Sequence, residues 1–381
     1  MMRTMEIVFW LSIGLMGYAY VGYPLVLRVL SMIRSRPVKK GEDPFSVSFV
    51  ITAYNEDNRI AEKLDNTLKL AYPKEKLEIL VASDCSSDRT DAIVQSYGPR
   101  GVRLVRAPQR KGKEAAQKLA VYEAAGEILV FSDVATILPE EAVRNIVRNF
   151  HDASVGCVSS VDRFIDQNGS PSGEGAYVKY EMFLRSLESR VNSLVGLSGS
   201  FFAARSAVCK QAWSEDLQSD FNTVLNSMRM GLRGVADPDS IGYYRNIADE
   251  RKEFDRKVRT VLRGISVFMK SLSLVNPFAH ATFAWQLVSH KLCRWLVPFG
   301  MLTAFVANAI LASTNAFYEG MFYVHVLFYG AALCGLLIRP LQQWSVIRLP
   351  AFFLLVNASI LKAWLRYWSG ERVVVWEPSK R

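Results

Sequence analysis

Long stretches without charged residues, at both ends of the chain, constrain its fold most strongly. Residues 7–27 contain no Asp, Glu, Lys or Arg, and a helix needs about 20 such residues to cross the hydrocarbon core of a bilayer. Two further charge-free runs, 295–318 and 320–338, are separated only by Glu319, and another apolar run covers 349–368. The sequence therefore predicts a membrane protein with apolar helices at both ends.

The first run predicts an uncleaved membrane anchor over residues 1–33. A cleaved signal peptide is the alternative, but the run is long, only Arg3 precedes it and no small-residue cleavage site follows. Basic residues cluster directly after the run, at Arg28, Arg34, Arg36, Lys39 and Lys40. Because basic flanks stay in the cytoplasm, we expect a cytoplasmic middle region and a location in the cell inner (plasma) membrane.

The C-terminal runs predict membrane helices over residues 295–368. The first two form a helical hairpin with a short external turn. The last run carries Lys362 and Arg366. Its basic residues would keep both of its ends in the cytoplasm, whereas counting the spans would place the C-terminus outside. Spanning, re-entrant and interfacial positions all stay open for residues 349–368. A basic tail, 369–381, follows.

Between residues 44 and 250 the pattern changes to short apolar strands that alternate with amphipathic helices. Strands are predicted at 46–53, 77–83, 102–107 and 127–132, each followed by a helical segment, as in a parallel α/β sheet. The five cysteines have no paired spacing that would indicate a zinc site or a disulfide framework. Half of the residues are hydrophobic and 22% are charged, which excludes a disordered chain.

Polar residues follow three of the predicted strands. Glu56 comes shortly after the first strand, Asp84 directly after the second and Asp133 directly after the fourth. A single carboxylate in such a place is commonly only a helix N-cap. Three aligned strand ends instead predict a binding cleft, because ligands of parallel sheets bind beyond the carboxyl ends of the strands.

Three motifs in sequence order carry a family resemblance: VSFVITAYNE (47–56), SDCSSDRT (83–90) and RKGKEAAQKLA (110–120). Together they resemble the membrane-bound family 2 glycosyltransferases. The resemblance implies a GT-A domain, which is a Rossmann-like α/β fold with a mixed, mostly parallel sheet. It also implies that Glu56 contacts the nucleotide, that Asp84 contacts uracil and that Lys113 lies near the nucleotide.

The chemistry of these residues suits a nucleotide-diphosphate sugar. Carboxylates can accept hydrogen bonds from a base and a ribose, and Arg110, Lys111 and Lys113 can pair with a diphosphate. Arg110 and Lys111 are nearly as well explained as a solvated start of a helix. Lys113, next to Gly112 at the start of the helix, is the stronger candidate.

One departure from the family concerns a metal ion. Members of the family usually carry Asp-x-Asp after the fourth strand, where the first Asp contacts the ribose and the second binds Mg²⁺ or Mn²⁺. This chain has Asp133, Val134 and Ala135. Asp133 is then the sole protein ligand for Mg²⁺ or Mn²⁺, so a weak site is expected.

Two further segments imply the acceptor site and the catalytic base. GLSGSFFAARSAV (196–208) resembles the strand that borders the acceptor, where Gly199 and Ser200 let a sugar approach the backbone. In SEDLQSDFNTVLNSMRMGLRG (214–234), Asp220 matches the family's general base. Glu215 and Asp216 are the alternative candidates, and a helix-dipole carboxylate is the structural alternative for Asp220.

The segment DRKVRT (255–260) resembles the Gln-x-x-Arg-Trp motif of processive members. Arg256 replaces Gln, Arg259 matches Arg and Thr260 stands where Trp would be, so an aromatic platform for a growing chain is missing. Arg259 is implied to hold the leaving diphosphate, with Arg256 beside it. Residues 251–294 are otherwise predicted to form interfacial amphipathic helices that contact anionic membrane lipids.

The hypothesis is an inverting glycosyltransferase. It moves a sugar from a UDP-sugar to a lipid-linked or growing glycan acceptor, for cell-surface or exopolysaccharide synthesis. A polymer synthase and a single-sugar transferase both stay open. The alternative is a non-catalytic, degenerate subunit of a polysaccharide assembly or export complex, with other export subunits as partners. The net charge of +10 fits a membrane border better than nucleic acid, which we do not expect as a partner.

Overall fold

The computed structural model describes residues 1–165, 176–245 and 250–372. The chain divides into two compact units. One contains residues 1–26, 249–266 and 284–372, and the other contains 27–248, 267–283 and 373–381. They are called the helical unit and the sheet unit below. The domain boundaries predicted from the sequence stay predictions, and most of the predicted tail lies outside the described residues.

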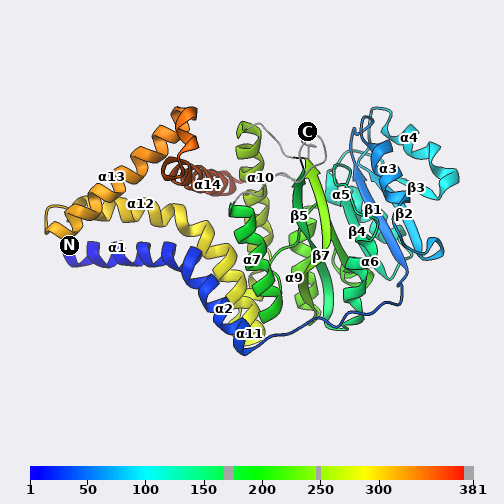
Figure 1. Ribbon diagram of the computed structural model, residues 1–381, viewed down its shortest axis with the longest axis horizontal. Helices are drawn as coiled ribbons and strands as arrows, with labels where there is room; N and C mark the ends of the chain where they lie inside the picture. The colour runs from blue at the N-terminus through cyan, green and yellow to red at the C-terminus, as the bar shows by residue number, and fades with distance from the viewer. Residues whose placement is uncertain (166–175, 246–249, 373–381) are drawn as a thin grey trace. The chain divides into compact units, whose positions relative to one another are not determined.

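The described part of the sheet unit contains one seven-stranded sheet with the strand order β3-β2-β1-β4-β6-β5-β7 (Figure 1). The four strands predicted from the sequence are confirmed within one or two residues at each end. The strands are β1 (Val47–Ala53), β2 (Leu77–Ser83), β3 (Val102–Arg106), β4 (Ile128–Asp133), β5 (Val155–Ile165), β6 (Phe201–Arg205) and β7 (Arg233–Arg245).

The direction of the strands changes once on each side of β6. Strands β3, β2, β1 and β4 are parallel, with Val47 opposite both Leu77 and Ile128. Strand β6 runs antiparallel to β4 and to β5, and β7 is again parallel to β5. The sheet is therefore mixed and mostly parallel, as expected for a GT-A domain.

Helices cover both faces of the sheet, because β1 is buried along its whole length and must be shielded on both sides. Phe49 and Ile51 of β1 pack in a core that also contains residues of α3, α4 and α6. On the opposite face, Gln117 of α5 donates a hydrogen bond to Thr52 of β1 at 3.0 Å. The helices are α3 (Ile60–Leu68), α4 (Thr90–Ser96), α5 (Lys113–Glu123), α6 (Ala142–Val147), α7 (Ala176–Val191), α8 (Ser206–Gln211) and α9 (Ser219–Arg229).

Four helices in the described residues are long and apolar enough to cross a membrane: Met2–Ile33, Pro277–Leu311, Ala316–Leu337 and Ser345–Trp368. They match the four apolar runs in the sequence. Whether 349–368 spans stays open. The α-helices within these four segments are α1 (Met2–Gly17), α2 (Tyr23–Ile33), α11 (Pro277–Leu287), α12 (Arg294–Leu311), α13 (Ala316–Leu337) and α14 (Ser345–Trp368). Helix α10 (Glu250–Met269) precedes α11 in the chain.

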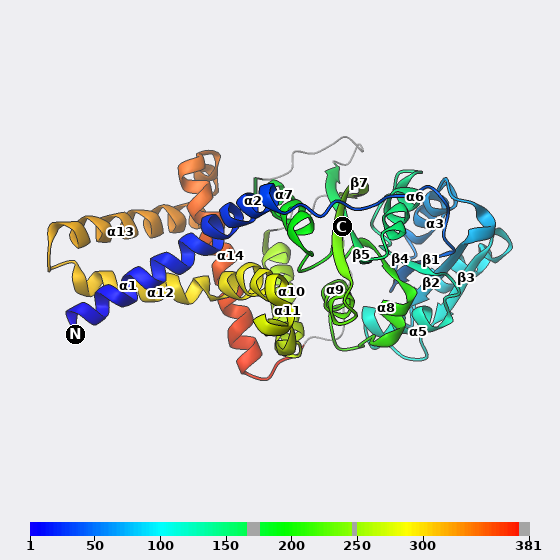
Figure 2. The ribbon, with the colours of Figure 1, turned by 90° about the horizontal axis from the view of Figure 1, so that it is seen from below.

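Within the helical unit, α12 contacts α1, α13 and α14, and Figure 2 shows α1 and α12 side by side. Ser12 and Thr303 share a hydrogen bond of 2.7 Å between α1 and α12, and Trp364 of α14 donates to the carbonyl of Trp295 at 2.9 Å. Much of the outer surface is apolar, and Leu327 of α13 is 71% exposed. Such a surface is typical of helices that face lipid, because monomeric soluble proteins rarely expose large apolar patches.

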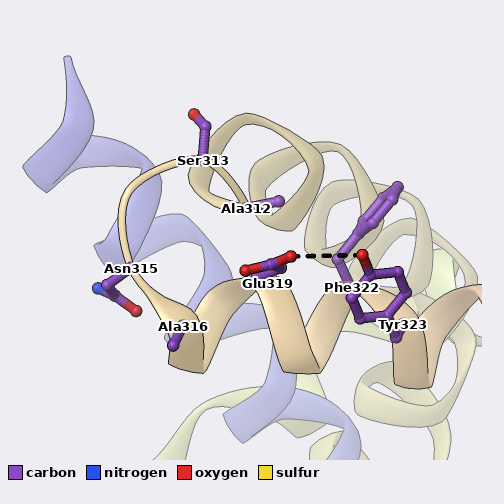
Figure 3. Close-up of a pocket in the computed structure, with 7 residues that line it drawn as sticks. All are labelled: Ala312, Ser313, Asn315, Ala316, Glu319, Phe322 and Tyr323. Carbon is purple, nitrogen blue, oxygen red and sulfur yellow. Dashed lines mark hydrogen bonds between the residues drawn. The ribbon is translucent and has the colours of Figure 1, made fainter.

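The turn between α12 and α13 is polar and hollowed. Asn315 caps α13 by accepting a hydrogen bond from the Tyr318 amide at 3.1 Å. Tyr323 donates a hydrogen bond to Glu319 at 3.3 Å, as the dashed line in Figure 3 shows. A hollow of about 510 Å³ lies beside this turn. The polar turn fits the helical hairpin predicted from the sequence, because a turn outside the hydrocarbon core can be solvated.

Candidate active site

The change of strand direction at β4 brings two loops to one edge of the sheet. Parallel β1, β2 and β4 end at this edge, and antiparallel β6 begins there, with Ser132 opposite Phe201. The amide of Asp133 donates a hydrogen bond to the carbonyl of Ser200 at 3.0 Å. Gly199 and Ser200 precede β6 rather than lying within it. The residues predicted to serve the donor and those predicted to serve the acceptor are therefore direct neighbours.

Lys113 connects these two loops. It is the first residue of α5, and its side chain reaches Asp133 Oδ1 at 2.5 Å and the carbonyl oxygen of Gly199 at 3.0 Å. The residue is 8% exposed, so this charge-assisted pair is partly shielded from water. A lysine held here places a positive charge beside the carboxylate at the end of β4.

Asp220 lies on the other side of Gly199. It is in the first turn of α9 and is 8% exposed. Its Oδ1 accepts from the amide of Phe221 at 2.7 Å and its Oδ2 accepts from Gln218 Nε2 at 3.1 Å. A Cβ atom on Gly199 would be only 2.4 Å from Asp220 Oδ2. The absence of a side chain at 199 therefore lets this carboxylate pack directly against the loop before β6.

Asp84 holds the loop before Lys113. It is fully buried, and its two carboxylate oxygens accept from the amides of Lys111 and Gly112, each at 2.9 Å. Gly112 has φ = +104°, a conformation that only glycine adopts readily. Burial raises the pKa of Asp84, while the two amides and Arg110 oppose this rise. The structure thus gives Asp84 a role in shaping the loop, and its predicted contact with uracil stays a prediction.

Glu56 is buried next to a partner on its own loop. It is 4% exposed, and its Oε2 lies 2.5 Å from an Arg59 nitrogen. Burial raises the pKa of Glu56, and the charge of Arg59 opposes the rise. On the same edge, the Arg110 guanidinium stacks 4.0 Å from the ring centroid of Tyr54. This pair joins the loop after β1 to the loop before α5.

Lys63 is a buried residue that the sequence analysis did not single out. It lies on α3, is 2% exposed, and donates to Ser132 Oγ and to the carbonyl of Thr136, both at 2.7 Å. Lys63 thereby contacts residues that precede and follow Asp133 in the chain. Burial lowers the pKa of Lys63 to about 7, with the Asp133 charge opposing. A lysine among the buried positions Ile60, Leu64 and Thr67 of α3 is the sequence signal that could have found it.

The donor atoms available for a metal ion are few. Within the described residues no group of three or more His, Cys, Asp or Glu side chains could hold one. Ala135 contributes no ligating atom, which leaves Asp133 as the carboxylate at this position. One carboxylate can suffice for Mg²⁺ when substrate phosphate oxygens and water complete the shell. Asp133 therefore fits a divalent ion that binds together with a diphosphate.

The remaining predicted residues lie elsewhere. Glu215 forms an ion pair with Lys118 at 2.7 Å, which lowers its pKa, and Asp216 is exposed. Both are weaker candidates for a base than Asp220. Arg256 and Arg259 lie on α10, in the helical unit, and their roles stay predictions.

The arrangement joins opposite charges at one edge of the sheet. The ammonium group of the buried lysine can pair with a phosphorylated ligand, and the carboxylate at the end of β4 can hold a cation beside it. A second carboxylate, Asp220, lies one glycine away and can accept a proton. The side chains at 133 and 220 thus approach a common segment, as the hypothesis of one cleft requires, and Asp84 joins them through the loop before Lys113.

Comparison with known proteins gives the same assignment. Residues 48–213 match the family described as Glycosyl transferase family 2. Poly-β-1,6-N-acetyl-D-glucosamine synthase of Staphylococcus aureus (strain MSSA476) is 26% identical over 196 residues, which are 49% of this chain and 46% of that protein. The synthase of Staphylococcus epidermidis is 25% identical over 179 residues, 45% of this chain and 42% of that protein. The chain thus spans less than half the length of these curated relatives.

The fold is also found among solved structures. The mannosyltransferase PcManGT from Pyrobaculum calidifontis, solved in complex with GDP-Man and Mn²⁺, superposes with a TM-score of 0.72. The two are 24% identical, and the match covers 96% of this chain and 100% of that one. Together with the mixed sheet, this confirms the predicted GT-A fold. Residues 48–213 of this chain therefore match the Glycosyl transferase family 2 model and lie in a domain with the GT-A fold.

Proposed function

We propose that this protein is an inverting glycosyltransferase that moves a sugar from a UDP-sugar to a glycan hydroxyl at a membrane surface. The observation that carries the proposal is the contact of Lys113 with both Asp133 and Gly199, together with Asp220 beside Gly199. A residue suited to the donor diphosphate and a residue suited to the acceptor proton thus meet at one three-residue loop, 198–200.

The donor is proposed to bind over the ends of β1, β2 and β4. Asp133 lies where it can accept from a ribose hydroxyl, and Lys113 lies where its ammonium can pair with the diphosphate. Asp84 keeps the 110–112 loop in place through two amide hydrogen bonds. UDP is the proposed nucleotide on the resemblance of the SDCSSDRT segment (83–90), and UDP-N-acetylglucosamine is the first donor to test, given the names of the relatives.

Asp220 is proposed as the general base. Each of its carboxylate oxygens already accepts one hydrogen bond and keeps a further lone pair for the proton of the acceptor hydroxyl. As that hydroxyl attacks the anomeric carbon, the bond from the anomeric carbon to the diphosphate breaks. The electron pair leaves with UDP, whose new charge Lys113 can stabilise. Inversion follows because the acceptor and the leaving group occupy opposite sides of the sugar.

Asp133 is the residue proposed to hold Mg²⁺ or Mn²⁺, with oxygens of the donor. Such an ion, when bound, neutralises charge on the leaving diphosphate. The acceptor is proposed to be a lipid-linked or growing glycan, and the protein is proposed to lie in the inner membrane with the sheet unit in the cytoplasm. The four apolar helices and the synthase relatives support this placement.

Release of UDP tests the proposal. Purified, detergent-solubilised protein is incubated with a panel of UDP-sugars and GDP-sugars, with and without Mn²⁺ and with and without EDTA. We expect UDP release from at least one UDP-sugar, and a loss in the Asp220→Asn variant. Release from a GDP-sugar alone would refute the proposed nucleotide. Asp84→Ala and Asp133→Ala should weaken UDP binding in calorimetry, and unchanged affinity in both would contradict the site.

The alternative, a non-catalytic subunit of an export complex, rests on the missing carboxylate at Ala135. The intact set of Lys113, Asp133 and Asp220 favours the enzyme. Turnover of any nucleotide sugar by the purified protein would exclude the alternative. The length of the product on a gel would then separate a polymer synthase from a single-sugar transferase.

A further inference from the structure

A buried polar network lies behind the loop that joins the two halves of the proposed site. Asp162 of β5 and Tyr244 of β7 both contact this loop through Ser198 and Ser200. Ser198 is 2% exposed and Tyr244 is 4% exposed, whereas Asp162 and Ser200 are partly exposed. The network therefore begins inside the sheet unit and ends at a hydroxyl that reaches the surface of the loop.

The contacts converge on one carboxylate oxygen. Asp162 Oδ1 lies 2.5 Å from Ser198 Oγ and 3.2 Å from the Tyr244 hydroxyl. Ser200 Oγ lies 3.1 Å from Ser198 Oγ and is also hydrogen-bonded to the Tyr244 hydroxyl. The three hydroxyls and the carboxylate thus form a ring in which each member contacts two others, and Asp162 Oδ1 also accepts from Ser160 Oγ at 3.5 Å.

The charge of Asp162 fixes the direction of these hydrogen bonds. An ionised carboxylate only accepts, so Ser198 donates its single proton to it. Tyr244 donates to Ser200 Oγ and, at the longer distance of 3.2 Å, to Asp162 Oδ1. Burial raises the pKa of Asp162, and the charge of Arg185 opposes this rise. Burial and the nearby Asp162 charge hold the pKa of Tyr244 well above its ordinary value, so Tyr244 keeps its proton.

The proton of Ser200 then has a fixed place. Because the Ser198 proton is directed to Asp162 and Tyr244 donates to Ser200, Ser200 donates its own proton inward, to Ser198 Oγ. What remains at the surface of the loop is one acceptor lone pair on Ser200 Oγ. A hydroxyl that can only accept selects a partner that donates, and a sugar hydroxyl is such a partner.

We propose that Asp162 and Tyr244 are positioning residues that orient the Ser200 hydroxyl to accept a hydrogen bond from a hydroxyl of the acceptor sugar. The proposal rests on the proposed function, since it deepens the acceptor side of the same site. The position of Ser200 supports it, because its carbonyl accepts from the Asp133 amide at 3.0 Å and its neighbour Gly199 adjoins Asp220. An acceptor hydrogen-bonded here lies within reach of the base.

The Asp162→Asn variant tests the direction of the network while keeping its shape. An amide in place of the carboxylate can donate to Ser198, which turns the Ser198 proton toward Ser200. Ser200 then presents its own proton at the surface of the loop and is no longer a pure acceptor. Transfer to a β-1,6-linked N-acetylglucosamine oligosaccharide and hydrolysis of the UDP-sugar by water are measured separately. We expect the acceptor KM to rise about three- to tenfold, the usual range for one lost neutral hydrogen bond, with hydrolysis and UDP affinity within twofold of the wild type.

A double-variant cycle separates orientation from general packing. If Asp162 acts through Ser200, Ser200→Ala and Asp162→Asn each raise the acceptor KM, and the double variant raises it no further than the larger single effect. Tyr244→Phe removes the hydroxyl that donates to Ser200 Oγ and should also raise the acceptor KM. Tyr243→Phe is the matched control, because it removes the hydroxyl of the neighbouring tyrosine, which is only partly buried. If the increases in acceptor KM of the two single variants multiply in the double variant, the proposal is overturned. A fall in UDP affinity equal to the fall in transfer would overturn it as well.

A failure of the proposed function gives a different result. If the wild type releases no UDP from any donor, the catalytic proposal fails, and calorimetric binding of the same oligosaccharide to the UDP-loaded protein decides on the network. Binding weakened by Ser200→Ala and by Asp162→Asn to the same extent supports it. Binding that neither variant changes, or no binding to the wild type, refutes it.

Discussion

The closeness of Gly199 to Asp220 allows a prediction whose size follows from the geometry. Gly199→Ala would place a Cβ 2.4 Å from Asp220 Oδ2 and 3.3 Å from its Cγ. Non-bonded atoms of this kind pack at about 3.5 Å, so one of them must move by about 1 Å. The carboxylate is the group that yields, because the backbone at 199 is fixed by the Lys113 contact and by the start of β6.

A shift of about 1 Å in a catalytic group can cost about 100-fold in rate, which corresponds to about 2.7 kcal/mol of barrier. Moving Asp220 also strains its hydrogen bonds to Phe221 and Gln218. Overpacking of this kind typically costs about 1 to 3 kcal/mol of stability. The variant should therefore fold, melt a few degrees lower and lose about two orders of magnitude in turnover.

The assay compares transfer rates and UDP affinity in the wild type, in Gly199→Ala and in Gly98→Ala. Gly98 is the matched control, because a Cβ there would meet nothing within 4 Å. We expect Gly98→Ala to turn over like the wild type, and Gly199→Ala to bind UDP with nearly unchanged affinity. Turnover of Gly199→Ala within threefold of the control would refute the claim that this glycine keeps the base in place.

Three further predictions follow from the site and its support. Asp220→Asn should lower turnover by about 10²- to 10⁴-fold, the usual contribution of a general base, with UDP affinity intact in calorimetry; Asp216→Asn is the control, and equal losses in both would disprove the assignment. Ala135→Asp should tighten Mn²⁺ binding in the presence of UDP, measured by paramagnetic resonance, because a second carboxylate joins Asp133; unchanged affinity would show that the ion binds elsewhere. Although burial pushes the pKa of Asp152 upward, hydrogen bonds from Ser154 and Arg233 lower it from 3.8 to about 2. A carboxyl group with a lowered pKa stabilises the fold above pH 3.8 and ceases to do so as the pH falls toward 2. The loss of stability in Asp152→Asn, measured by denaturant unfolding, should therefore be largest at neutral pH and shrink between pH 4 and 2. A difference in stability that stays constant with pH would contradict this.

The fold was accessible from the sequence because its signals are local. Charge-free runs of about 20 residues and short apolar strands before polar turns need no knowledge of distant contacts. The four parallel strands were found for this reason. The resemblance implied a strand within 196–208 and a mixed sheet, but the place of antiparallel β6 between β4 and β5 was not predicted. Strand order depends on pairing between residues that are 69–77 apart for β4 and β6 and 43–47 apart for β5 and β6.

The candidate site was predicted in part. Glu56, Asp84, Lys113, Asp133 and Asp220 follow strands or begin helices, so their type and place are visible along the chain. The structure adds the direction of their contacts. Both oxygens of Asp84 bind the 110–112 loop, a partner 27 residues away that no spacing rule indicates.

Other residues were not predicted from the sequence, because they lie in segments that otherwise contribute to the apolar core. Lys63 and Asp162 are charged residues in a helix face and a strand whose buried positions otherwise look like ordinary core. Their partners come from β4, β7 and the loop before β6. Polar networks of this kind are assembled only when distant segments pack together, so the sequence alone gives little sign of them.

The hydrogen bond from the Asp133 amide to the Ser200 carbonyl has a consequence for how such a protein can change. Strand β4, which ends in the proposed donor loop, and strand β6, which starts from the proposed acceptor loop, are hydrogen-bonded side by side. If these roles hold, a substitution that reshapes the donor loop for a new nucleotide sugar also moves the loop on which the receiving glycan is proposed to rest. New specificities should arise through paired changes on the two strands, and attempts to engineer one half alone should give hybrids that bind their substrate but transfer it poorly.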